Sequence, residues 1–102
     1  MAVVETFKAL GDPVRLEMVR RLASGSTYSV GGISSGLGIS RQGARKHLKV
    51  LTEAGLIILE SKGRETQVHI DRDSLDAARR FIAELEQRWD ERLEALRDFA
   101  ES

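Results

Sequence analysis

The chain has 102 residues, with 16 basic and 16 acidic side chains and a formal net charge of zero. That length is typical of one globular domain, and because cysteine is absent, disulfides, thiolate metal ligands and a cysteine redox switch are excluded. We expect a cytoplasmic protein, since there is no apolar run of membrane-spanning length and no basic start followed by an apolar stretch, as in a signal peptide.

The first quarter of the chain predicts two helices joined by a glycine turn. Apolar residues between residues 3 and 10 recur at helical spacing, so a short helix is expected to end at Gly11. Asp12 is a favourable N-cap for the second helix, and Pro13 suits its first turn, where a missing N–H leaves no bond unmade. The buried side of this second helix is expected to comprise Leu16, Val19, Leu22 and Ala23.

Residues 28–39 predict a short third helix. Val30, Ile33 and Leu37 keep helical spacing. The three glycines between them each weaken a helix by about 1 kcal/mol relative to alanine. We therefore expect this helix to depend on tertiary packing and to end by Gly38.

Residues 40–54 predict an amphipathic helix that begins after Ser40 as its N-cap and stops at Gly55. The expected apolar face consists of Ala44, Leu48 and Leu51. The opposite face, here called the cationic stripe, consists of Gln42, Arg45, Lys46 and Lys49. Arg41 lies beside this stripe. A helix, a tight glycine turn and a second helix with a basic outer face are typical of a helix-turn-helix unit that reads a DNA major groove. The competing interpretation is a solvated surface helix.

Residues 56–60 and 66–70 predict the two strands of a hairpin whose turn, residues 61–64, contains a glycine. Lys62 and Arg64 stand at this turn. Such a hairpin after a reading helix is interpreted as a wing that contacts phosphates or the minor groove.

Charge is segregated along the chain although the total is zero. Residues 41–64 contain six basic and two acidic residues, a local charge of +4. Residues 71–102 contain ten acidic and six basic residues, a local charge of −4. This separation favours one side that faces DNA and one that faces away from it.

From residue 73 to residue 100 the pattern predicts one long helix with an apolar stripe. Residues 75–100 would span roughly 39 Å at 1.5 Å per residue, which exceeds what a core of this size covers. Its uncovered part is expected to form the interface with a second copy of the chain. The interface residues we expect are Leu85, Trp89, Leu93 and Leu96.

Three motifs in order, residues 7–16, 38–48 and 51–57, give the chain a resemblance to the ArsR-type winged-helix repressors over nearly its whole length. The resemblance implies a homodimer that binds a palindromic operator in double-stranded DNA and represses transcription, usually of its own operon. The residues it assigns to the reading helix are Ser40, Arg41, Gln42, Arg45 and Lys46, and those it assigns to the wing are Lys62 and Arg64.

The chain departs from the metal-sensing members of that group. It lacks the cysteine pair that some of them carry in the reading head, and residues 74–102 hold no histidine for a site on the last helix. We therefore expect no metal and no cofactor; a small-molecule effector stays open. His47 is expected to be packed or hydrogen-bonded within the fold, and His69 to lie at the surface.

The predicted fold is mainly α with a two-stranded β-wing: a winged helix-turn-helix with a long C-terminal dimerisation helix. Within one domain, residues 1–72 would form the DNA-reading core and residues 73–100 the dimerisation helix. The predicted function is sequence-specific repression by a homodimer. The alternative is a winged-helix protein-interaction module, since fold alone does not fix function. No residue constellation supports an enzyme.

Overall fold

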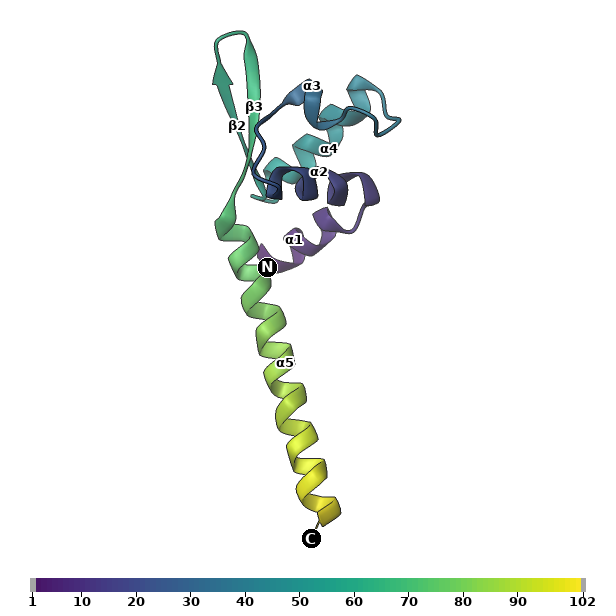
Figure 1. Cartoon of the computed structure of the whole chain (residues 1–102), viewed down its shortest axis with the longest axis vertical. Coiled ribbons are helices and arrows are strands. Elements are labelled where there is room, and N and C mark those ends of the chain that lie inside the picture. The colour runs from purple at the N-terminus through teal and green to yellow at the C-terminus, as the bar shows by residue number, and fades with distance from the viewer. Residues whose placement is uncertain (1, 102) are drawn as a thin grey trace.

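The structure, a computed structural model, describes residues 2–101 and measures 68 × 25 × 25 Å. In chain order the elements are α1 (Ala2–Leu10), α2 (Pro13–Ala23), β1 (Tyr28–Ser29), α3 (Val30–Ile33), α4 (Arg41–Glu53), β2 (Ile57–Lys62), β3 (Glu65–Ile70) and α5 (Arg72–Glu101). The helices α1 to α4 and a small sheet form a body, and the last helix projects from it (Figure 1).

Side-chain caps define where α2 and α4 begin. Asp12 Oδ2 accepts hydrogen bonds from the backbone N–H groups of Val14, at 2.8 Å, and Arg15, at 3.1 Å. Ser40 Oγ accepts one from the Gly43 N–H at 3.0 Å. Each bond satisfies a helix N–H that has no partner within its own helix. Both predicted N-caps are confirmed.

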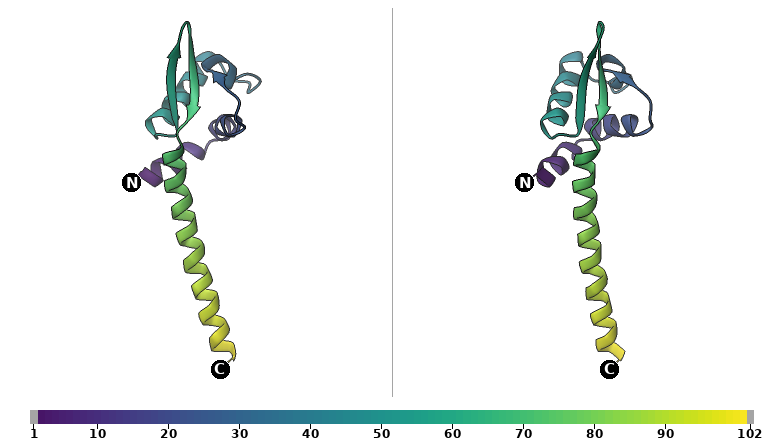
Figure 2. Two further views of the ribbon diagram at one scale, coloured as in Figure 1. Left: turned by 60° about the vertical axis from the view of Figure 1, so that its left-hand side comes forward. Right: turned by 90° about the vertical axis from the view of Figure 1, so that its left-hand side faces the viewer.

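The sheet lies beside the helices of the body in both turned views (Figure 2), and the core contains residues of both. Its largest fully buried apolar side chains are Met18, Ile33, Leu51, Leu56 and Val68. The predicted buried side of α2 was wrong in part, because Leu16 is 46% exposed and Ala23 is also exposed. At about 100° per residue, both lie some 100–120° around α2 from buried Leu22. Met18, which the prediction omitted, lies on the inward side.

The third segment differs from its prediction in two ways. α3 is only four residues long, and Leu37 lies beyond it, after Gly36 has adopted a positive φ of 77°. The two residues before α3 form β1, an unpredicted strand that pairs Tyr28 with Val68. The sheet therefore has three antiparallel strands in the order β1-β3-β2.

β2 and β3 form the predicted wing, with a tighter turn than expected. Pairing runs from Ile57 with Ile70 to Lys62 with Glu65, so the loop contains only two residues. The first of these, Gly63, has a φ of +63°, which a glycine adopts without strain in a two-residue hairpin. The mainly helical fold with a wing is confirmed.

α5 is a single helix of 30 residues. Near its start, α1 packs against it, and the rings of Phe7 and Phe81 meet edge-on with centroids 5.8 Å apart. Every residue from Arg79 to Glu101 is exposed. None of the helices within residues 2–101 combines the length and apolar character needed to cross a membrane.

Candidate nucleic-acid interface

α4 has one anchored face and one open face. Ala44 and Leu48 are each 3% exposed and Leu51 is fully buried, so the apolar side is part of the core. All four residues of the cationic stripe (Gln42, Arg45, Lys46 and Lys49) are exposed on the other side. Ser40 and Arg41 are exposed where the helix begins. The core thus fixes which side of α4 faces solvent.

One cation of the cationic stripe, Lys49, lies near an acidic side chain. Lys49 Nζ lies 4.0 Å from Glu53 Oε1, one turn further along α4. Both side chains are well exposed, and such pairs contribute little to stability. Arg45 and Lys46 have no ion-pair partner within residues 2–101. The strongest positive potential of α4 therefore comes from its first half.

The wing lies next to α4. Leu59 of β2 borders the same hollow, of about 350 Å³, as Arg45 and Lys49 of α4. Lys62 and Arg64 are exposed near the hairpin tip. Lys62 Nζ is 3.9 Å from Glu60 Oε1, so its charge is partly offset.

The two histidines lie on different elements. The His47 side chain is 22% exposed, and its Nδ1 lies 3.3 Å from Nη1 of Arg15. The prediction that His47 is hydrogen-bonded within the fold is confirmed. The His69 side chain is 41% exposed, with Nε2 3.9 Å from Glu60 Oε2, which agrees with a surface position. Within residues 2–101 no group of three or more histidine and acidic side chains is arranged to hold a metal ion.

Asp12 joins α2 to this part of α4. Its Oδ2 lies 3.8 Å from His47 Nδ1. The pKa of Asp12 is lowered, chiefly because the carboxylate accepts the backbone N–H of Arg15, and also because it accepts that of Val14 and lies near the charge of Arg15.

Arg15 is the residue of this region that the sequence analysis missed. Its partner His47 lies 32 positions away in the chain. Helix periodicity and capping rules report only on neighbours within a few positions, so no local signal identified the contact.

The predicted interface residues of α5 are uncovered in the single chain. Leu85 is 50% exposed, Trp89 60%, Leu93 42% and Leu96 55%. Phe99 extends this row and is 81% exposed. Its position three residues after Leu96 is the signal that would have included it.

The sequence profile of a helix-turn-helix domain family matches residues 10–60. No curated protein matches the chain. The chain is similar to the structure of an ArsR-like transcriptional regulator from Rhodococcus sp. RHA1, with 29% identity, a TM-score of 0.82 and coverage of 97% of this chain and 92% of the other.

Two further solved structures are similar. One is an ArsR family transcriptional regulator, with 25% identity, a TM-score of 0.80 and coverage of 87% of this chain and 91% of the other. The second is described as a possible transcriptional regulator for arsenical resistance, with 28% identity, a TM-score of 0.69 and coverage of 76% and 80%.

Proposed function

This chain belongs to the helix-turn-helix family and is a DNA-binding regulator of the ArsR type, and from that premise we propose that it represses transcription as a homodimer on a palindromic operator. Family and fold are those of transcriptional regulators, which are not enzymes. We further propose that the operator lies upstream of its own operon. Because a repressor must reach the chromosome, we place the protein in the cytoplasm.

The observation that carries the proposal is the division of α4 into a buried apolar face and an exposed cationic stripe. A helix held from behind presents its outer side chains at fixed positions, as base readout in a major groove requires. Within the stripe, Gln42 and Arg45 are suited to adenine and guanine respectively, because each forms two hydrogen bonds to the base edge.

The remaining proposed DNA contacts are assigned to phosphates. Ser40 and Arg41 at the start of α4, Lys46 and Lys49 along it, and Lys62 and Arg64 on the wing are all exposed. Phosphate contacts fix the register of a protein on the duplex without reading its sequence. Five such cations per protomer, or ten per dimer, predict a slope of log K against log salt of about −9.

The dimer is proposed from α5. We divide the chain into a DNA-reading core, residues 1–72, and a dimerisation helix, residues 73–100. The apolar row from Leu85 to Leu96 is too exposed for a stable free surface, and a second copy related by a two-fold axis would cover it. Two α4 helices would then meet half-sites about one helical turn, or 34–36 Å, apart.

Fluorescence anisotropy tests the proposal, with labelled duplex from upstream of the chain's own gene and a scrambled duplex of equal length. We expect saturable binding with a clear preference for the upstream duplex. Arg45→Ala should weaken that binding at least about thirtyfold, since the dimer loses two bidentate base contacts, each worth roughly 1–3 kcal/mol.

Arg80→Ala is the matched control, because Arg80 is exposed on α5 and lies about 180° around that helix from Trp89. It should leave the titration unchanged. Equal affinity for the two duplexes, unaffected by Arg45→Ala, would overturn the proposal in favour of a protein-interaction module.

A further inference from the structure

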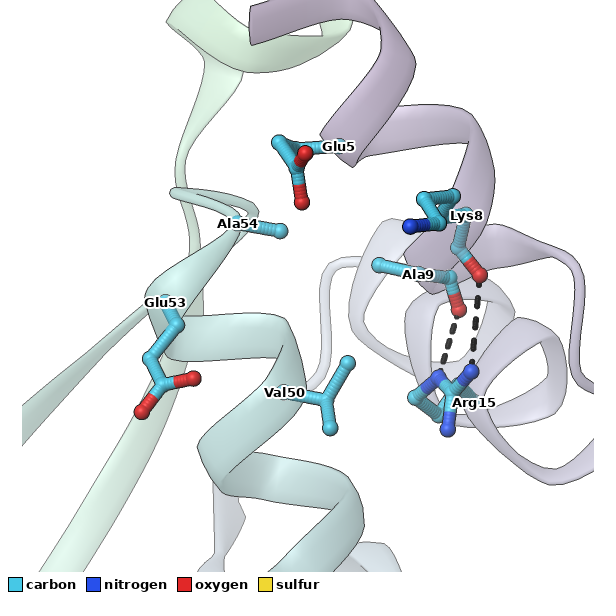
Figure 3. Close-up of a pocket in the computed structure, with 7 residues that line it drawn as sticks. All are labelled: Glu5, Lys8, Ala9, Arg15, Val50, Glu53 and Ala54. Atoms are coloured by element: carbon cyan, nitrogen blue, oxygen red, sulfur yellow. Dashed lines mark hydrogen bonds between the residues drawn. The ribbon is translucent and has the colours of Figure 1, made fainter.

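The side chain of Arg15 connects three helices. It extends from α2, and its Nε donates to the carbonyl oxygen of Ala9 at 2.7 Å, while Nη2 reaches that of Lys8 at 3.4 Å. These are carbonyls in the last turn of α1, and Figure 3 shows both bonds as dashed lines. The remaining terminal nitrogen, Nη1, lies 3.3 Å from His47 Nδ1 on α4. One guanidinium therefore joins the end of α1 to the middle of α4.

Arg15 borders a hollow between α1 and α4, and Figure 3 shows the residues that line it. The hollow, of about 390 Å³, lies beside the second half of α4. Val50 of α4 points into it and is 37% exposed. Arg15 lies at one end of the hollow, and the N–H groups of its planar guanidinium reach both helices.

The hydrogen-bonding groups of arginine determine which atom of the Arg15–His47 contact donates. Arginine has no acceptor, so His47 Nδ1 must accept the hydrogen bond from Nη1. The Asp12 carboxylate, 3.8 Å from His47 Nδ1, also accepts the backbone N–H of Arg15. The carboxylate thus holds the backbone of the residue that carries the guanidinium. A lysine has no planar fork with which to reproduce these contacts.

The Arg15 contact is connected to α5 through α1. α1, whose carbonyls Arg15 binds, packs on α5 through the Phe7–Phe81 ring contact. α5 therefore holds α1, and Arg15 links α1 to His47 of α4. In the homodimer proposed above, this sequence of contacts repeats in each protomer on either side of the two-fold axis.

We propose that Arg15 is a positioning residue that fixes the orientation of α4 relative to α1 and α5, and thereby sets the half-site spacing that the dimer accepts. This inference rests on the proposed function. Arg15 itself touches no DNA in this account. It acts through His47, on the helix that carries the cationic stripe.

The test uses half-sites that the wild-type chain selects from random DNA. Three duplexes are built from them: one with the selected spacing between half-sites, one with an added base pair and one with a base pair removed. One base pair rotates a half-site by about 34–36°, so a rigid dimer should lose about tenfold in affinity at either altered spacing. Arg15→Gln and His47→Leu should lose less than about threefold, because α4 can then turn to follow the half-site. Circular dichroism checks that each variant is folded.

Arg20→Gln is the matched control. Arg20 lies on the same helix, its side chain is 76% exposed, and its ion pair is with Glu17 on that helix. Arg20→Gln should lose as much affinity at altered half-site spacing as the wild type does. All variants should keep the wild-type salt slope, since no phosphate contact is removed.

A defect of stability alone would lower affinity at every spacing equally and would leave the loss at altered spacing unchanged. If Arg15→Gln does not fold, His47→Leu decides, because it leaves the bonds from Arg15 to α1 in place. The inference is overturned if both variants fold and both lose as much affinity at altered spacing as the wild type does. It is also overturned if His47→Leu is the only variant that folds and it shows that full loss. The proposed function stays intact in either case. If the wild type selects no paired half-sites, the proposed function itself fails.

Discussion

α4 and the outer half of α5 are both amphipathic helices, and their apolar faces have opposite surroundings. On α4 the apolar face is buried, with Leu51 fully covered by the rest of the chain. On α5 the apolar row is open, and Trp89 is 60% exposed. A buried apolar face fixes a helix in its own protomer, whereas an open one needs another molecule.

The difference shows what hydrophobic periodicity reports. Apolar residues at three- and four-residue spacing identify the face of a helix that avoids water, but not the chain that covers it. For α4 the cover includes α2 and the sheet. For α5 we propose that it comes from a second copy, and four experiments test this contrast.

The largest effect is expected where α4 is anchored. Leu51→Ala should lower the free energy of unfolding by about 2–5 kcal/mol, because it leaves a cavity in the core. Val50→Ala, at a neighbouring position that is 37% exposed, should cost less than about 1 kcal/mol. Urea unfolding at one fixed protein concentration measures both. Equal losses would show that α4 does not have one anchored face.

The second experiment addresses the open face of α5. Trp89→Ala should weaken dimerisation by at least about 2 kcal/mol, roughly thirtyfold, since a large aromatic side chain at the centre of an interface carries much of its energy. Gln87→Ala, on the far side of the helix, should not change it. Sedimentation equilibrium measures both constants. A wild-type chain that stays monomeric at micromolar concentration would remove the contrast between the helices.

The third experiment compares α4 with the wing. Lys62→Ala should weaken binding to all duplexes by a similar factor and flatten the salt slope by about 1.8, because a dimer loses two phosphate contacts. Arg45→Ala should instead reduce the preference for the operator over other sequences. Anisotropy titrations over a range of salt concentrations separate the two effects. Unchanged titrations for both variants would contradict the proposed reading head.

The smallest effect concerns Asp12, near the buried side of α4. Its folded-state pKa is lowered, so its carboxylate stabilises the fold above the unfolded value of about 3.9, and this contribution is lost as pH falls through the folded pKa. Asp12→Asn keeps a capping oxygen but does not titrate, so the loss of stability below about pH 4 should be shallower. Thermal unfolding between pH 2 and about 6 measures it. Superimposable pH profiles would contradict this role.

Local signals predicted much of the fold. The caps at Asp12 and Ser40, the two faces of α4, the hairpin and the long helix all depend on residues within a few positions of one another. β1 was missed because two residues carry no periodicity, and they form a strand only by pairing with β3. The inward side of α2 was misplaced because several rotations satisfied its pattern, and tertiary packing chose one with Met18 inside.

For the candidate site, the sequence predicted which α4 and wing residues face outward but not what holds α4 in place. The Arg15–His47 contact joins two helices whose arrangement depends on the whole core. The pairing of Lys49 with Glu53, in contrast, has the i,i+4 spacing of a helical ion pair, so a local signal for it is present in the sequence.

Selection of bound duplexes from random DNA tests the central claim most directly, because the protein itself then chooses the sequence and the spacing that it binds. The account predicts an inverted repeat whose half-sites have centres one helical turn, or 10–10.5 base pairs, apart. Recovery of a single unsymmetrical site, or of duplexes with no shared motif, would contradict it.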